Sequence, residues 1–277
     1  MKLTLAIATI FTFTLGFYTT QTIAALLENP KSFTDWCQQK STLPQETKHT
    51  VEVLLKKAQT QNCKQANQKL ANLTFLDLNS NQISDIKPLS ALTNLTSLSL
   101  RSNQISDIKP LSTLTNLTVL LLHSNQISDI KPLSTLTNLI VLDLGSNKIT
   151  EIKPLSNLTN LTILSLVGNQ ISDIKPLSTL TNLTFLDLGS NKITEIKPLS
   201  NLTNLTILSL NLNQISDIKS LSTLTNLTFL DLGSNKITEI KPLSTLKKLK
   251  FININNNFLV INKCPVKPES ICQFYEP

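Results

Sequence analysis

The chain has 277 residues and a formal net charge of +7, which is modest for this length. It carries no unbalanced basic stripe with interleaved aromatic side chains, so we exclude a nucleic-acid-binding protein. Only two His residues occur, and no Gly-rich phosphate loop, nucleophile elbow or paired metal-ligand motif accompanies them. The sequence therefore argues against an enzyme, a metal site and a cofactor.

Residues 1–25 are typical of a secretory signal peptide. Lys2 forms the positive start, an apolar stretch with interspersed Thr follows, and Ala24 and Ala25 are small residues suited to cleavage. A membrane anchor is the alternative, but the segment is shorter than the apolar run that a span usually needs. We expect a secreted or periplasmic mature chain without a membrane span.

Residues 26–72 contain no repeat and predict a helical N-terminal cap. Residues 32–40 can form a short helix, and residues 47–58 a longer one with a single apolar stripe. A stack of repeats needs its open apolar end covered. We expect Trp36, the only Trp, to lie in the core of this cap.

Residues 73–259 consist of nine consecutive copies of a 22-residue repeat, with no insertion between them. The first copy begins at Leu73 with LTFLDLNSNQI. Its alternation of Leu with other residues predicts a short strand with one buried face. Later apolar positions come at spacings of three, which suits a 3₁₀ turn that starts near Pro88. The pattern L-x-x-L-x-L-x-x-N-x-I/L at this period is the leucine-rich repeat signature.

We therefore predict an α/β repeat solenoid, a leucine-rich repeat horseshoe with a parallel concave β-sheet and 3₁₀-type convex arms. At the end of each strand one Asn turns inward, and a buried amide must be hydrogen-bonded. We expect these residues to form a structural Asn ladder that bonds the backbone of adjacent coils. Its members are Asn81, Asn103, Asn125, Asn147, Asn169, Asn191, Asn213, Asn235 and Asn257.

Most charges of the repeats form two columns, one acidic from Asp85 to Glu239 and one of Lys two residues later. Exposed ion pairs contribute about 0–1 kcal/mol each. We interpret the two columns as a solvated, self-neutralising edge. Asn-Leu-Thr also recurs and matches the glycosylation acceptor motif, but the repeat itself dictates this spelling.

Side chains that alternate with the buried Leu residues point outward in three columns, which we call the strand face. The columns start at Phe75, Asp77 and Asn79 and recur every 22 residues. So long an apolar stripe exceeds what monomers normally expose and favours a partner-binding face. Cross-strand stacking of good strand formers is the alternative. The candidate partner-binding residues are Phe75, Arg101, Val119, Leu121, His123, Val141, Ile163, Val167, Phe185, Ile207, Asn211, Phe229 and Phe251.

Residues 139–182 and 183–226 are a tandem duplication that differs at five positions. The differing pairs are Ile140/Thr184, Val141/Phe185, Val167/Asn211, Gly168/Leu212 and Pro176/Ser220. The first four pairs lie on or beside the strand face, more than an even spread of differences would place there. This distribution supports the binding interpretation.

Residues 260–277 predict a C-terminal cap built as a Pro-braced loop. The four Cys lie in the two caps and allow three connectivities. Eight coil spacings separate the caps by about 40 Å, beyond disulfide reach. We therefore expect the bridges Cys37–Cys63 and Cys264–Cys272. A Cys-based metal site is the alternative, but each end holds one pair and the compartment is oxidising.

His123 could face Asp143 on the next strand. A lone His–Asp pair without a third partner is weak evidence for catalysis, and a solvent-facing or structural His is the simpler interpretation.

The unit Leu-Thr-x-Leu-x-Leu-x-x-Asn-Gln-Ile-Ser-Asp-Ile-Lys-Pro-Leu-Ser-x-Leu-Thr-Asn resembles the 22-residue repeats of bacterial internalins and their relatives over residues 73–259. The resemblance implies a secreted or surface-displayed module that binds a protein across its concave face. Residues 260–277 do not resemble the immunoglobulin-like domain that follows the repeats of internalins, so we do not expect the resemblance to extend to host-cell adhesion.

The sequence thus predicts a secreted, non-enzymatic, monomeric module that binds a protein partner. A passive cell-envelope protein, whose repeats serve stability only, is the alternative.

The compartment prediction is testable by intact-mass analysis of the exported protein. We expect cleavage near Ala24 or Ala25 and four Cys that resist alkylation, because the chain would cross into an oxidising compartment. A retained Met1, or four alkylatable Cys, would contradict it.

Overall fold

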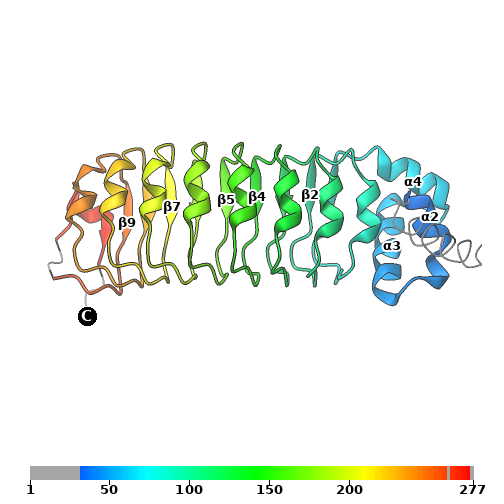
Figure 1. The fold of residues 1–277 in the computed structure, drawn as a ribbon, viewed down its shortest axis with the longest axis horizontal. Coiled ribbons are helices and arrows are strands. Elements are labelled where there is room, and N and C mark those ends of the chain that lie inside the picture. The colour runs from blue at the N-terminus through cyan, green and yellow to red at the C-terminus, as the bar shows by residue number, and fades with distance from the viewer. Residues whose placement is uncertain (1–31, 261–262, 275–277) are drawn as a thin grey trace, which may run out of the picture.

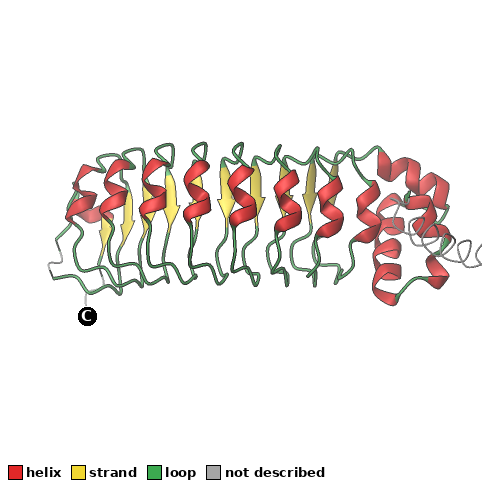
Figure 2. Cartoon of the chain, in the orientation of Figure 1, coloured by secondary structure: helices red, strands yellow, loops and turns green. Residues whose placement is uncertain are grey.

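The structure, a computed structural model, describes residues 32–260 and 263–274. Three α-helices cluster at one end, and an extended row of coils follows (Figure 1). Each coil has a short strand in one layer and a 3₁₀ turn in the other (Figure 2). The predicted solenoid with a parallel sheet, 3₁₀ turns and a helical cap is confirmed. The predicted signal peptide, residues 1–25, lies outside the described residues.

The helices of the described residues form the N-terminal cap and the turns. The cap holds α2 (Phe33–Gln38), η1 (Lys40–Thr42), α3 (Gln45–Ala58) and α4 (Cys63–Ala71). The 3₁₀ turns are η2 (Lys87–Ala91), η3 (Lys109–Thr113), η4 (Lys131–Thr135), η5 (Lys153–Asn157), η6 (Lys175–Thr179), η7 (Lys197–Asn201), η8 (Lys219–Thr223), η9 (Lys241–Thr245) and η10 (Glu269–Ile271).

The strands of the described residues form one open, parallel sheet and pair in chain order. They are β1 (Phe75–Asp77), β2 (Ser97–Ser99), β3 (Val119–Leu121), β4 (Val141–Asp143), β5 (Ile163–Ser165), β6 (Phe185–Asp187), β7 (Ile207–Ser209), β8 (Phe229–Asp231), β9 (Phe251–Asn253) and β10 (Cys272–Gln273). Between consecutive coils up to β9 each residue pairs with the one 22 positions later, as Phe75 does with Ser97.

Identical apolar positions stack because this register has no slip. In the first coil, Leu78, Ile83 and Leu89 have no exposed surface. The spacing of three matches the backbone bonding: the N–H of Leu89 donates to the Ile86 carbonyl at 2.9 Å, and that of Leu92 to the Leu89 carbonyl at 2.9 Å. The same side chains therefore define the 3₁₀ turn and fill the core layer between coils.

From Asn103 to Asn257 the inward-turned Asn side chains connect each coil to the one before it. Asn81, predicted as the first member, instead donates to the Asn79 carbonyl of its own coil at 2.8 Å, because no coil precedes it. Asn147 is 9% exposed. Its Nδ2 donates to the carbonyls of Leu122, Leu144 and Gly145 at 3.1, 3.0 and 3.0 Å. Its Oδ1 accepts from the N–H of Ile127 at 3.0 Å. One amide thus satisfies buried groups of two coils, which neither coil could satisfy alone.

Two further side-chain ladders connect the coils, and the sequence interpretation missed both. The Asn and Thr of the recurring Asn-Leu-Thr supply them: Asn116 Nδ2 donates to the Thr93 carbonyl at 2.9 Å, and Thr118 Oγ1 to the Thr96 carbonyl at 3.1 Å. The same Asn bond recurs at Asn94, Asn138, Asn160, Asn182, Asn204 and Asn226. The Asn-Leu-Thr spelling therefore has a structural role in stacking.

The N-terminal cap seats its helix α3 on the first coil. Thr50 Oγ1 donates to the Asp85 carbonyl at 2.6 Å, and His49 Nε2 lies 2.6 Å from the Asn81 carbonyl oxygen. These two contacts dock α3 against the first coil. Phe33 is fully buried, whereas Trp36 is only partly buried against the core. Trp36 therefore packs against the core of the cap but is less buried than expected.

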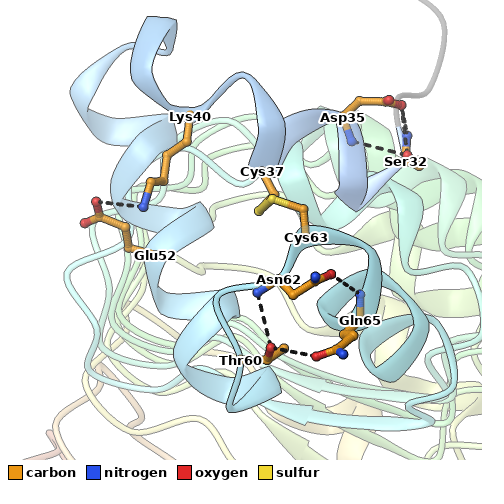
Figure 3. Close-up of a disulfide and its surroundings, with 9 residues drawn as sticks. All are labelled: Ser32, Asp35, Cys37, Lys40, Glu52, Thr60, Asn62, Cys63 and Gln65. Carbon is orange, nitrogen blue, oxygen red and sulfur yellow. Dashed lines mark hydrogen bonds and ion pairs between the residues drawn. A yellow bond between two sulfur atoms is a disulfide. The ribbon is translucent and has the colours of Figure 1, made fainter.

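The predicted bridge Cys37–Cys63 joins α2 to α4, with Cα atoms 5.5 Å apart (Figure 3). Ser32 and Asp35 form a capping box at the start of α2.

The second bridge, Cys264–Cys272, has Cα atoms 5.8 Å apart. Both disulfides fit an oxidising compartment. Along residues 32–260 and 263–274, no helix has the length and apolarity to cross a membrane.

The C-terminal cap is more than the loop that the sequence predicted. After the repeats, β10 adds to the sheet beside β9, and the N–H of Ile254 donates to the Gln273 carbonyl at 3.2 Å. A two-residue strand without the repeat pattern carries no periodic signal, so sequence analysis could not detect it. Its effect is to cover the outer edge of β9.

The acidic column has a different role from the one expected. The backbone N–H of Lys109 donates to Asp107 Oδ1 at 2.8 Å, and that of Lys175 to Asp173 Oδ1 at 2.8 Å. Within the two columns of the described chain, only Lys87–Asp85 at 3.5 Å and Lys219–Asp217 at 4.0 Å form ion pairs. The Asp residues close the start of η2, η3, η4, η6 and η8, as Asx turns do, whereas the column holds Glu before η5, η7 and η9.

The Asn147→Leu variant tests the Asn ladder. It removes the Asn147 bonds of four backbone groups. The carbonyls of Leu122, Leu144 and Gly145 each keep one other donor, so each loses a bond worth about 0.5–1.5 kcal/mol. The Ile127 N–H loses its partner, at a cost of about 1–3 kcal/mol. We expect a loss of about 3–5 kcal/mol in the free energy of unfolding and a clearly lower Tm in a thermal melt.

The matched control is Asn157→Leu, which changes an exposed Asn at the end of η5 in the same coil. It should leave the melt nearly unchanged. Equal melting curves for the two variants would contradict the ladder's role.

Candidate binding surface

The strand face carries a nearly continuous apolar column. The sheet register places Val119, Val141 and Ile163 directly beside one another. Phe75 is 59% exposed and Ile163 40% exposed, and the other apolar members of the column are half-buried. Ser97 separates Phe75 from the rest. The face thus offers apolar side chains that the core between the coils does not enclose.

Two rings of this column stack on each other. The centroids of Phe229 and Phe251 are 4.7 Å apart, with an interplanar angle of 6°. Such a pair contributes about 0.5–1.5 kcal/mol beyond its burial. At these two positions the cross-strand stacking interpretation therefore applies, although the outer surface of the pair remains open to a ligand.

Where the second column holds an Asp, its carboxylate caps the backbone two residues later. Asp143 Oδ1 accepts from the Gly145 N–H at 3.1 Å, and Asp187 Oδ1 from the Gly189 N–H at 3.0 Å. Asp231 caps Gly233 in the same way at 3.0 Å. One carboxylate oxygen of each Asp is therefore engaged with the backbone, and the column still presents negative charge every second coil.

The structure brings two predicted residues of the third column, Arg101 and His123, together around Asp143. Arg101 Nη2 lies 2.9 Å from Asp143 Oδ2, and His123 Nδ1 lies 3.6 Å from Asp143 Oδ1. Gly145 makes room for this arrangement, since a Cβ built there would come within 2.4 Å of His123 Nδ1.

The Arg101–Asp143 ion pair holds this cluster together, and the His123 imidazole lies beside the same carboxylate. The cluster joins three coils across the strand face and presents donors of two side chains to solvent. Within the described residues, no group of three or more His, Cys, Asp or Glu could hold a metal ion. The side chains of Arg101 and His123, which are 46% and 37% exposed, can contact polar groups of a ligand.

The side chains of Asn211 and Val167 pack over Gly189 and Gly145 of the preceding coils. A Cβ at Gly189 would lie 2.2 Å from Asn211 Oδ1, and one at Gly145 would lie 2.9 Å from Val167 Cγ1. Ser209 Oγ also donates to Asn211 Oδ1 at 3.0 Å. The alternation of Gly with larger residues along the third column thus fits side chains of one coil over the backbone of its neighbour.

Leu212 lies beside the strand face, directly after Asn211 of the third column, and sequence analysis named it only as a difference within the duplication. It has a φ of 53° and is 53% exposed. The equivalent positions hold Gly168, at a φ of 68°, and Ser in most other coils. A left-handed backbone disfavours a bulky residue, so a large apolar side chain here is both strained and solvated. Only the backbone angles reveal this.

Grooves also occur on the opposite side of the molecule, between successive 3₁₀ turns. One groove of about 630 Å³ lies between η6 and η7 and is lined by Asp173, Lys175, Glu195 and Lys197 among others. Similar grooves follow at neighbouring turns, as the repeat requires. Their lining repeats with the coils, whereas the strand face varies along the row.

A family model described as Leucine Rich repeats (2 copies) matches residues 71–113, 115–157, 137–179, 159–201, 181–223, 203–244 and 225–263. Internalin C2 from Listeria monocytogenes is 34% identical, with a TM-score of 0.69 over 73% of this chain and 91% of that chain. A leucine-rich repeat protein from Leptospira interrogans is 32% identical, with a TM-score of 0.67 over 76% of this chain and 56% of that chain.

A plant peptide hormone receptor, RGFR1 in complex with RGF2, is 27% identical, with a TM-score of 0.61 over 69% of this chain and 34% of that chain. No curated protein sequence matches the chain.

Exchanging the residues of the duplication tests the strain at Leu212. A left-handed backbone costs an L-residue about 1–2 kcal/mol. We therefore expect Leu212→Gly to raise the free energy of unfolding by about 1 kcal/mol in urea titrations, and Gly168→Leu to lower it by about as much. A loss of stability in Leu212→Gly would show that packing outweighs backbone strain.

Proposed function

Because the chain belongs to the leucine-rich repeat family and is internalin-like, we propose that it is a secreted, non-enzymatic module that recognises a protein partner through the strand face. Domains of this family are in general protein-binding modules, and the receptor RGFR1 is one whose structure contains a peptide hormone, RGF2. For this chain, the partner and the face that binds it are the proposal.

The exposed apolar column is the observation that carries the choice of face. Phe75, Ile163 and the half-buried Phe185 contribute apolar surface that the coils do not need for stacking, since the buried Leu and Ile layers supply the core. Aromatic side chains and Arg dominate the energetics of protein interfaces. Arg101 on the same face adds the charged contact that such interfaces use.

The tandem duplication supports the same face. The two copies keep every core position and differ at Val141/Phe185, Val167/Asn211 and Gly168/Leu212. Each of these differences changes the shape or polarity of the strand face while the stacking residues stay the same. Such divergence suits a surface whose contacts matter individually.

Export is supported by two features of the chain. Its two disulfides require an oxidising environment to form and persist. Its first 25 residues have the composition of a signal peptide. We propose that the mature protein acts outside the cytoplasm, either released or in the periplasm.

A passive structural role in the cell envelope is the second candidate. The stacked rings of Phe229 and Phe251 favour it, because they use strand-face residues for stability. The side-chain ladders would equally serve a protein whose repeats act as a rigid spacer.

Partner capture from culture supernatant and envelope extract separates the two candidates. We expect Phe185→Ala to reduce capture by at least about tenfold with a nearly unchanged melt, because hot-spot truncations cost about 2 kcal/mol or more. Phe229→Ala should also lower stability by about 0.5–1.5 kcal/mol, since it loses the stacked partner Phe251.

The matched control is Lys175→Ala/Lys197→Ala on the 3₁₀ side, which should capture the partner normally. Loss of capture only in this control would move the site to the turns. Normal capture in all variants, with lower melting of the Phe variants, would favour the passive role.

A further inference from the structure

The positive charge of the repeat region is concentrated at its C-terminal end. Residues 73–240 hold twelve acidic and eleven basic side chains and are nearly neutral. From residue 241 onward, the described chain contains six Lys and only one acidic residue, Glu269. The six are Lys241, Lys247, Lys248, Lys250, Lys263 and Lys267. The C-terminal end of the solenoid therefore has a surface chemistry that the preceding coils lack.

Three of these Lys break the repeat pattern at neighbouring positions. Lys247, Lys248 and Lys250 stand where the preceding coil has Thr225, Asn226 and Thr228. All three are exposed, and none pairs with an acid among the ion pairs of the described residues. Lys248 Nζ donates to Asn226 Oδ1 at 2.7 Å, which holds one ammonium just before β8 and β9 begin.

These substitutions weaken the stacking ladders. In the preceding coil Asn226 Nδ2 donates to the Thr203 carbonyl at 2.9 Å, and Thr228 Oγ1 to the Thr206 carbonyl at 3.1 Å. Lys248 and Lys250 lack the amide and the hydroxyl that would continue both bonds. Protection of a sheet edge by Lys is not needed here, because β10 already covers the edge of β9.

The Lys cluster adjoins the stacked pair of the strand face. Lys250 directly precedes Phe251, whose ring stacks on Phe229 at 4.7 Å. Lys250 thus lies beside an apolar platform, and none of the three Lys forms an ion pair within the described residues. Charge complementarity across an interface calls for a partner that brings acidic groups to this corner and an apolar side chain to the rings.

We propose that Lys247, Lys248 and Lys250, together with Phe229 and Phe251, form a subsite for an acidic polypeptide segment that carries an apolar side chain. The inference rests on the proposed recognition by the strand face. A uniform polyanion suits the face less well, because Asp231, Asp187 and Asp143 follow along it at every second coil. A peptide places its carboxylates over the Lys residues and its uncharged residues over the column.

The test uses the full mature chain and a fluorescent peptide with two Glu on each side of one Phe, followed by anisotropy. The variant Lys247→Thr/Lys248→Asn/Lys250→Thr restores the repeat pattern, so it should melt at or above the wild-type temperature. The control Lys175→Thr/Lys197→Thr/Lys219→Thr removes the same charge from the 3₁₀ side. Phosphatidylglycerol vesicles and a peptide with Gln for Glu are the comparison ligands.

We expect the wild type to bind the Glu peptide, the first variant to bind it at least about tenfold more weakly, and the control to bind it within about twofold of the wild type. Added salt should weaken the binding. The inference is overturned if the Gln peptide binds equally well, if both variants lose equally, if no binding is measurable, or if vesicles bind at least as tightly as the peptide.

Self-association of the restored variant in size-exclusion chromatography would also overturn the inference, because the Lys residues would then protect the sheet edge. Capture of the natural partner separates the two proposals. If Phe185→Ala loses capture while the restored variant retains it fully, recognition by the strand face stands and the acidic subsite fails.

Discussion

Hydrogen bonding between coils, centred on the buried Asn side chains, is the constraint on which the rest of the molecule depends. Where each strand turns inward, carbonyl and N–H groups of the backbone are buried without partners in regular structure. Asn147 meets this need for two coils at once, donating to Leu122 and accepting from Ile127. Because the bond works only at one register, the 22-residue period admits no insertion, and three-residue strands suffice to build the sheet.

This invariant interior leaves the outward positions free to differ. At two positions the outward residue is unfavourable for the coil itself. Leu212 occupies a left-handed backbone that disfavours a bulky side chain, and Lys250 lacks the hydroxyl that the equivalent Thr228 donates to the neighbouring coil. Such breaks of local consistency are typical of functional positions. They lie on or beside the same strand face as the apolar column, so independent features point to one side of the molecule.

The strand face combines packing and recognition. Phe229 and Phe251 stack on each other, while Phe75 and Ile163 remain exposed. Around Asp143, Arg101 and His123 assemble a polar cluster that Gly145 makes possible. An interface with apolar residues bordered by charges is common in protein recognition. Net charge also varies along the solenoid: residues 73–240 are nearly neutral, and the described residues from 241 onward are basic.

The sequence by itself determined the solenoid, the parallel sheet, the 3₁₀ turns and both disulfide pairings, because a strict period imposes one environment on every equivalent residue. Tertiary structure alone decided features without a period: β10, the partial exposure of Trp36, the use of Asp107 as a cap and the Asn-Leu-Thr ladders. It also decided which strand-face residues meet, since Arg101 reaches Asp143 across 42 residues of sequence. Contacts between side chains of different coils depend on geometry that periodicity does not encode.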